Sequence, residues 1–269
     1  MIALATSTSA AGALSELIPL ALLGFAYAKR AHTLGLRRRP VPGRRQACFY
    51  GGLATIALTL TALAGASQEL VMAHMAQELL LGDIGALLLV LGLTGPLIAP
   101  ILRVRLFDRL RVLAHPLIAF PLWAINLYAW HLQIFYESAL DHSGVHALEH
   151  MMLLGFGVNM WMCLVGPLPM PSWFGNGAKL AYVVAVRVTG AVLANLFLWS
   201  GNLFYAHYTS GDAARHISPI ADQNIAGAVM VVEQSALTLG LLYWLFLRSR
   251  QGEQTRERLD LAHSHTVWR

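Results

Sequence analysis

Long apolar stretches, separated by short polar and charged segments, run through almost the whole chain. Seven of them are long enough for helices that cross the hydrocarbon core of a bilayer, which takes roughly 20 residues each. The pattern therefore predicts an all-α integral membrane protein with seven transmembrane helices in one domain, residues 1–247, and a polar cytoplasmic tail, residues 248–269. The predicted spans are Ser15–Ala28 with a few residues upstream, Gln46–Ala64, Glu69–Leu93, His115–Leu132, His146–Val165, Lys179–Ser200 and Asp222–Leu247.

The positive charges lie almost entirely on one side of this arrangement. Of the 19 Lys and Arg residues, 17 lie between spans one and two, between spans three and four, at the start of span six or in the tail. Arg215 lies on the opposite side and Arg187 inside span six. Because cytoplasmic loops are enriched in Lys and Arg, we predict an N-terminus outside and a C-terminus in the cytoplasm, in a bacterial inner membrane.

The composition supports a membrane protein. The chain is 57% hydrophobic and only 12% charged, with a mean hydropathy of +0.56. A soluble protein usually carries about 25% charged residues, so these values argue against a soluble enzyme, and they equally argue against disorder. The net charge of +5 comes from loops beside apolar spans. It therefore indicates membrane topology and contact with lipid, and no nucleic-acid partner is expected.

Four histidines lie at similar depth near the outer ends of three predicted spans. His74 is in the first turns of span three, His131 in the last turn of span four, and His146 and His150 in the first turns of span five. Residues four apart share one helix face, so His146 and His150 can bind one metal ion. Polar groups inside a span are costly and usually functional, so we predict a metal site.

Carboxylate and thioether groups accompany these histidines. Glu78 is four residues from His74 and is expected on the same face. Glu149 is three residues from His146 and is expected behind the ligands, where a carboxylate orients an imidazole. Met75 is also close, and imidazole with thioether suits copper, especially Cu(I). The predicted metal ligands are His74, Glu78, His131, His146 and His150.

Two opposite charges lie deeper in the predicted membrane. Arg187 is inside span six, and Glu233 is near the middle of span seven. Each unpaired charge costs about 2.5–3.5 kcal/mol on insertion scales, so we predict that they form a buried charge pair. The pair has two interpretations, a path for protons or substrate, and a contact that fixes the packing of two spans.

The chain resembles the membrane-integral cytochrome c oxidase assembly factors of the bacterial CtaG type, from about Leu17 to Leu247. The resemblance rests on the order of several separated stretches and their placement on seven spans. These are Ala73-His74-Met75-Ala76-Gln77-Glu78, His115-Pro116, Trp130-His131, His146-Ala147-Leu148-Glu149-His150, and Asp222-Gln223 followed by Ala226-Gly227 and Met230.

The resemblance implies a role in building the copper-containing core of a terminal oxidase. It implies a non-enzymatic protein that takes copper at the outer face, from an outer-face copper donor, and passes it to an oxidase subunit in the same membrane. Two departures from the family pattern are Glu78, where the family commonly has His, and Gln133, where it often has Pro. The first matters more, because a carboxylate shifts metal preference towards Zn(II) or Cu(II).

Two alternative functions remain open. The motif His146-x-x-Glu149-His150 matches an inverted zinc-protease pattern, so the chain could be a membrane zinc hydrolase in which Glu149 activates water. Histidines that face each other on two spans could instead be axial ligands of a b-type haem. The position of all four histidines near the outer edge argues against haem.

Overall fold

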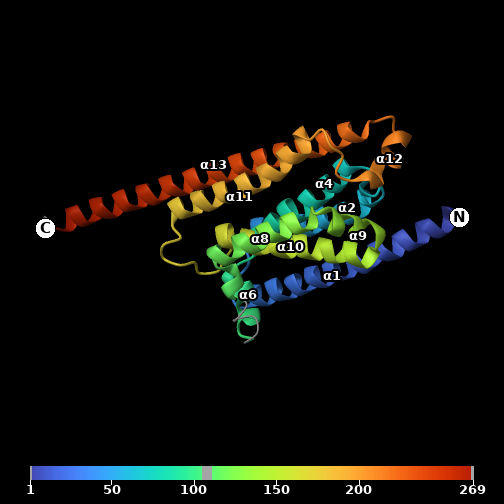
Figure 1. The fold of residues 1–269 in the computed structure, drawn as a ribbon. Helices are drawn as coiled ribbons and strands as arrows, with labels where there is room; N and C mark the ends of the chain where they lie inside the picture. The colour runs from blue at the N-terminus through green and yellow to red at the C-terminus, as the bar shows by residue number, and fades with distance from the viewer. Residues whose placement is uncertain (1, 105–110, 268–269) are drawn as a thin grey trace.

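The computed structural model describes residues 2–104 and 111–267, and in this part of the chain it contains helices and no strands. Figure 1 shows long helices that run roughly along one direction, with the two chain ends at opposite ends of the molecule. The all-α prediction is therefore confirmed for the described residues.

Four helical stretches are long and apolar enough to cross a membrane. A fifth candidate is a bent pair, α8 (Pro116–Trp130) and α9 (Gln133–Asp141), whose axes differ by 68°. The four are Val71–Gly92, formed by α4 (Val71–Leu79), the π-helical segment η1 (Leu80–Gly85) and α5 (Ala86–Gly92); α10 (Ser143–Val165); α11 (Asn176–Trp199); and Pro219–Leu247, the first part of α13 (Pro219–Val267).

The other two predicted spans are also helical. They correspond to α1 (Ile2–Leu36) and α2 (Gly43–Ala62), which do not pass the same test of length and hydropathy within the described residues. The structure thus supports four or five spans by this test, and the count of seven stays a prediction. The predicted tail continues the helix of α13 as far as Val267.

Several predicted loops contain helices instead. The segment after His131 was expected to be an outer loop, but it forms α9, which buries Tyr136 and Ala139. The chain breaks before it because Leu132 is extended, with φ −69° and ψ 133°. The remaining short helices are α3 (Ala64–Ser67), α6 (Gly95–Leu102), η2 (Arg111–Ala114), η3 (Ala206–Tyr208) and α12 (Thr209–Ala214).

A close backbone approach joins α10 to the π-helical segment. A side-chain carbon at Gly157 would collide with the carbonyl oxygen of Gly82. Small residues allow membrane helices to pack this closely. The contact fixes α10 against η1, and thereby against α4.

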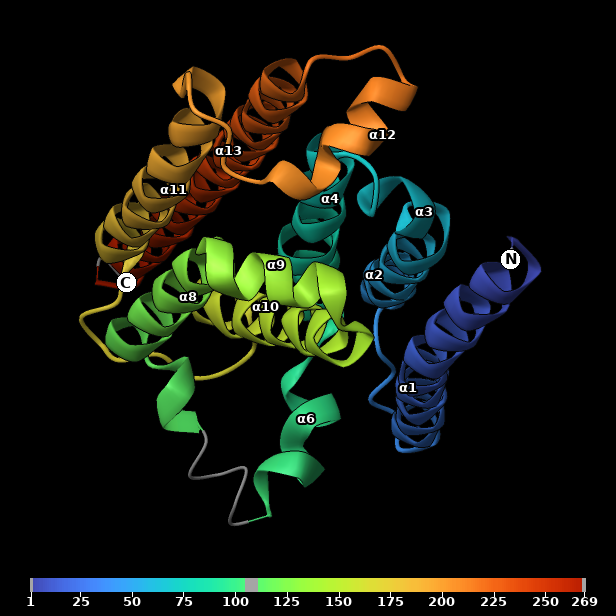
Figure 2. The ribbon, with the colours of Figure 1, turned by 45° about the vertical axis from the view of Figure 1, so that its right-hand side comes forward.

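The start of α13 is tied to the start of α4. Asp222 accepts hydrogen bonds from the backbone N–H groups of Val71, at 2.6 Å, and Met72, at 3.1 Å. A carboxylate at a helix N-terminus is favourable, because it satisfies free N–H groups and complements the helix dipole. Gln223 holds the preceding connection through Phe204 N, at 2.8 Å, and Asn202 O, at 3.0 Å. This end of the molecule, where α3, α9 and α12 also lie (Figures 1 and 2), is called the α12 end below.

The opposite end carries arginines bound to backbone carbonyl groups. Arg45 donates to Leu91 O and Leu93 O, each at 2.9 Å. Arg30 donates to Pro96 O at 2.9 Å. These bonds satisfy carbonyl groups where α5 ends and α6 begins. This end is called the basic end below.

Candidate metal centre

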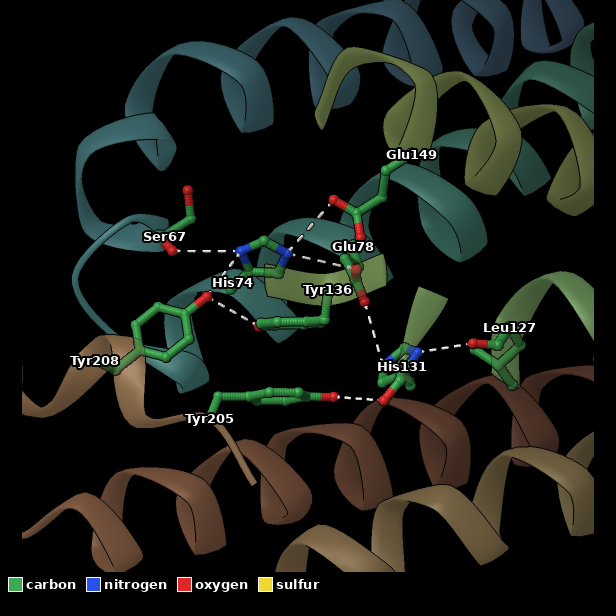
Figure 3. A network of polar contacts seen from close by, with 9 residues as sticks. All are labelled: Ser67, His74, Glu78, Leu127, His131, Tyr136, Glu149, Tyr205 and Tyr208. Atoms are coloured by element: carbon green, nitrogen blue, oxygen red, sulfur yellow. Dashed lines mark hydrogen bonds and ion pairs between the residues drawn. The ribbon is translucent and has the colours of Figure 1, made fainter. Parts of the chain in front are cut away.

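The structure brings the predicted histidines and carboxylates together at the α12 end. His74 and Glu78 come from α4, His131 directly follows α8, and His146, Glu149 and His150 come from α10. His74 Nε2 lies 3.5 Å from Glu78 Oε1 and 3.9 Å from Glu149 Oε2. His131 Nε2 lies 3.4 Å from Glu78 Oε2. Figure 3 shows His74 and His131 on either side of Glu78. These six residues are called the His–Glu cluster.

The remaining histidines lie against His74. The ring centroids of His74 and His146 are 5.7 Å apart, and those of His146 and His150 are 4.2 Å apart. His74, His146 and Glu149 each offer one ligand atom within a group whose members all lie within 4.8 Å of one another. The sequence analysis predicted that Glu149 orients a ligand and does not bind the metal itself. In the structure, its carboxylate faces the same space as the imidazoles of His74 and His146. Which of these residues bind a metal stays a prediction.

The cluster is deeply buried. The exposed fraction is 1% for His74, 0% for Glu149 and 7% for Glu78. A buried carboxylate needs hydrogen bonds, a positive partner or a proton to offset its lost hydration. The two glutamates therefore need a hydrogen-bond donor, a proton or a cation in the space between them and the imidazoles.

Backbone carbonyl groups orient two of the imidazoles. His74 Nδ1 lies 3.3 Å from Ser67 O, and His131 Nδ1 lies 2.8 Å from Leu127 O. A carbonyl oxygen only accepts, so these contacts favour the tautomer that carries the hydrogen on Nδ1. In the neutral imidazole, Nε2 then keeps its lone pair, and in both residues Nε2 faces Glu78. This tautomer, fixed by a bond at the other nitrogen, is typical of histidines that bind metals.

The facing atoms are acceptors without donors. Among the described residues, no hydrogen-bond partner is found for Nε2 of His74, His131 and His146, for Glu78 Oε1, or for either carboxylate oxygen of Glu149. Acceptor atoms that converge in a buried space are stabilised by protons or by a bound cation. The residues therefore fit a metal ion with imidazole and carboxylate ligands, a set that suits Zn(II) or Cu(II).

Three tyrosines outside the predicted set of ligands support the cluster. The hydroxyl of Tyr208 lies 3.2 Å from His74 Nδ1 and 2.9 Å from the hydroxyl of Tyr136. Tyr205 donates to the backbone oxygen of His131 at 2.7 Å and stacks on Tyr136, with ring centroids 3.7 Å apart. Burial raises the pKa of Tyr205 and of Tyr208, so both hydroxyls keep their protons. Tyr205 and Tyr208 lie in an outer connection, and no spacing pattern in the sequence relates them to the histidines.

A small cavity adjoins the cluster on the side away from the α12 end. Its volume is about 40 Å³, and Glu78, His131 and Met75 line it together with Asp83 and Asn126. Met75 is 1% exposed, and its role as a residue supporting the site stays a prediction.

The pairing of Arg187 with Glu233 stays a prediction, and a third charged residue interacts with both. No direct ion pair joins the two side chains in the described structure, and both carboxylate oxygens of Glu233 and the Nε and Nη2 atoms of Arg187 lack hydrogen-bond partners. Arg187 interacts electrostatically with Glu233 and also with Asp83 of η1. The sequence signal for Asp83 is an acidic side chain inside the third predicted span.

Comparison with known proteins identifies a family. The family model described as cytochrome c oxidase caa3 assembly factor (Caa3_CtaG) matches residues 25–251. No curated protein and no solved structure matches the chain significantly. The matched range includes every residue of the His–Glu cluster and the three charged residues Asp83, Arg187 and Glu233.

Proposed function

This chain belongs to the family of cytochrome c oxidase caa3 assembly factors, and we propose that it acts there by handling copper at the His–Glu cluster. The protein binds a copper ion at the outer face of the bacterial inner membrane and passes it to an oxidase subunit in the same membrane. The observation that carries this proposal is the convergence of acceptor atoms from His74, His146 and Glu149 within 4.8 Å.

The proposal includes seven spans with the N-terminus outside. Under this topology, the α12 end, and with it the His–Glu cluster, faces outwards. Two features support it: the Lys and Arg residues concentrate in the predicted cytoplasmic segments, and Arg30 and Arg45 lie at the basic end. An outward-facing cluster can receive copper from an outer-face donor.

Binding and release follow from the chemistry of the ligands. A cation that binds to imidazole and carboxylate groups replaces protons that these groups otherwise hold. His74 and Glu149 favour a divalent ion, and the thioether of Met75, near Glu78, offers a softer ligand to Cu(I). Transfer by ligand exchange requires a coordination position that an incoming ligand can reach, unlike a closed structural site. The acceptor subunit supplies that incoming ligand.

A non-catalytic role agrees with the family. In the zinc hydrolase alternative, Glu149 activates a water molecule that attacks a substrate. Metal content and its loss in the cluster variant, described below, distinguish this alternative from copper handling. The haem alternative predicts a coloured protein, which an absorption spectrum tests.

The experiment compares two matched double variants of the detergent-purified protein. His146→Ala/Glu149→Gln removes two of the converging groups. His142→Ala/Glu137→Gln removes the same side-chain types from positions outside the cluster, near the end of α9. The measurements are metal content after loading with copper, and oxidase activity and copper content of membranes from a strain that lacks the native protein.

The expected result is near-stoichiometric copper in the wild type and the control, loss of copper in the cluster variant, and loss of oxidase activity with it. Zinc that is lost in the cluster variant would favour the hydrolase instead. Absence of bound copper in the wild type after loading with Cu(I) and with Cu(II) would contradict copper handling, although the family membership would still stand.

A further inference from the structure

Three charged side chains from different helices lie near the middle of the candidate spans and interact electrostatically. Asp83 lies within Val71–Gly92, Arg187 within Asn176–Trp199 and Glu233 within Pro219–Leu247, each well away from both ends of its span. Asp83 is 9% exposed, and both carboxylate oxygens of Glu233 are fully covered.

The charges of the three groups do not balance when all are ionised. Arg187 is a permanent cation, and it interacts with both carboxyl groups, which also repel each other. Two carboxylates with one guanidinium leave one negative charge inside a bilayer, where an unbalanced charge is costly. A single proton on either carboxyl group removes this imbalance.

We propose that Asp83, Arg187 and Glu233 form an intramembrane proton-binding site, in which one carboxylate balances the guanidinium and the other carboxyl group holds one exchangeable proton. The polar atoms that lack protein partners support this, since they include Asp83 Oδ1, both carboxylate oxygens of Glu233, and Nε and Nη2 of Arg187. The site stands apart from the proposed copper binding and does not depend on it.

The neighbouring groups on α10, α8 and α2 are uncharged. The Arg187 guanidinium carbon lies 5.8 Å from the ring of Trp161 on α10, and Asn126 of α8 lines the cavity beside Asp83. On the side of α2, Ile56 packs against Gly85 of η1. Among the described residues, the charged groups that act on Asp83 and Glu233 are Arg187 and these two carboxyl groups themselves.

The cavity gives the proton a route to the His–Glu cluster. Its volume of about 40 Å³ accommodates roughly three water molecules, at about 10–15 Å³ for each. Glu78 and His131 line one part of it, and Asn126 and Asp83 line another. The Oδ1 atoms of Asn126 and Asp83 lack protein partners, so bound water has polar groups to contact. Water in this cavity connects Asp83 to the cluster.

Infrared spectroscopy of the purified protein tests the site. A protonated carboxyl group gives a carbonyl band that shifts in D2O. Because one proton is shared, both Asp83→Asn and Glu233→Gln should lose the same band at neutral pH, since the remaining carboxylate then pairs with Arg187. Arg187→Gln should show a larger band, since both carboxyl groups become protonated. The exposed control Glu69→Gln should leave the band unchanged.

The proposal is overturned if neither carboxyl variant loses the band, if only one does, or if Arg187→Gln leaves its size unchanged. A test on the wild type avoids any folding defect of the variants. Dicyclohexylcarbodiimide modifies protonated carboxyl groups in apolar surroundings, and mass spectrometry should locate an adduct on Asp83 or Glu233. Adducts on other carboxyl groups but on neither of these would contradict the proposal.

The same band tests the route through the cavity. Asn126→Leu keeps a similar side-chain size but removes the polar lining next to Asp83. The band should remain, and its shift after transfer to D2O should become slower than in the wild type. An unchanged rate of exchange would exclude the cavity as the route and leave the proton site to the other measurements.

Discussion

At the scale of single residues, the cluster depends on groups that contact the Nδ1 atoms of two histidines. Ser67 and Tyr208 contact His74 Nδ1, while Leu127 contacts His131 Nδ1. These contacts direct both Nε2 atoms towards Glu78. The acceptor geometry is therefore set by backbone carbonyl groups and one hydroxyl, which explains why ligand spacing alone could not predict it.

Removing the hydroxyl of Tyr208 should weaken metal binding without unfolding the protein. Tyr208→Phe deletes the contact with His74 Nδ1, and loss of such a supporting group typically lowers metal affinity by about 10-fold or more. Tyr128→Phe is the matched control, because it also removes a tyrosine hydroxyl. That hydroxyl donates to Thr189 O of α11 and does not contact a histidine of the cluster. Chelator competition measures the affinity of each variant. Equal affinities for both would show that Tyr208 does not orient His74.

Asp212 gives the α12 end a pH dependence of its own. Burial, followed by the neighbouring charge of Asp222, raises the pKa of Asp212 from 3.8 to about 6. Between these two pH values, Asp212 is therefore protonated in the folded protein but ionised in the unfolded chain. The stabilisation that comes from this proton on Asp212 is fully present below pH 4 and is lost as the pH rises to about 6.

Asp212→Asn should remove this pH dependence. The variant should be more stable than the wild type at pH 7, by on the order of 1 kcal/mol, since charge interactions near the surface are screened. The difference should vanish near pH 4. Thermal unfolding in detergent across this pH range measures it. A constant difference between the two proteins at all pH values would contradict the assignment to Asp212.

At the scale of elements, hydropathy located the helices but missed their interruptions. All seven predicted spans are helical, because apolar stretches of this length leave the backbone little alternative in a membrane. The π-helical segment Leu80–Gly85 and the 68° bend between α8 and α9 were not predicted. Both depend on packing against other helices, which a single stretch of sequence does not contain.

Gly157 should tolerate no larger side chain. Gly157→Leu places a side chain against the carbonyl of Gly82 and should destabilise the protein by about 1–3 kcal/mol, the usual cost of overpacking. Gly155→Leu is the matched control on the same helix, because no atom lies within 4 Å of the added carbon. Thermal unfolding should show a lower Tm for the first variant only. An equal effect of both would indicate a general loss of α10 stability.

At the scale of the whole molecule, the sequence predicted which groups gather but not how they face one another. Helix direction and depth were enough to place His74, His131 and His146 at one end. The position of Glu149 within the group, and of Asp83 beside Arg187, required the rotation of each helix about its axis. That rotation comes from contacts such as the one between Gly82 and Gly157.

The orientation of the molecule decides whether an outer-face role is possible. Single cysteines in a chain that lacks Cys48 and Cys163 can measure it. Ser210→Cys lies at the α12 end, and Ser172→Cys lies in the connection between α10 and α11 at the other end (Figure 1). Both serines are exposed. A thiol reagent that cannot cross membranes should label Ser210→Cys in intact cells and Ser172→Cys only after the cells are opened. The reverse pattern would place the His–Glu cluster in the cytoplasm, where an outer-face donor cannot reach it, and would contradict copper capture from outside even if the cluster binds copper.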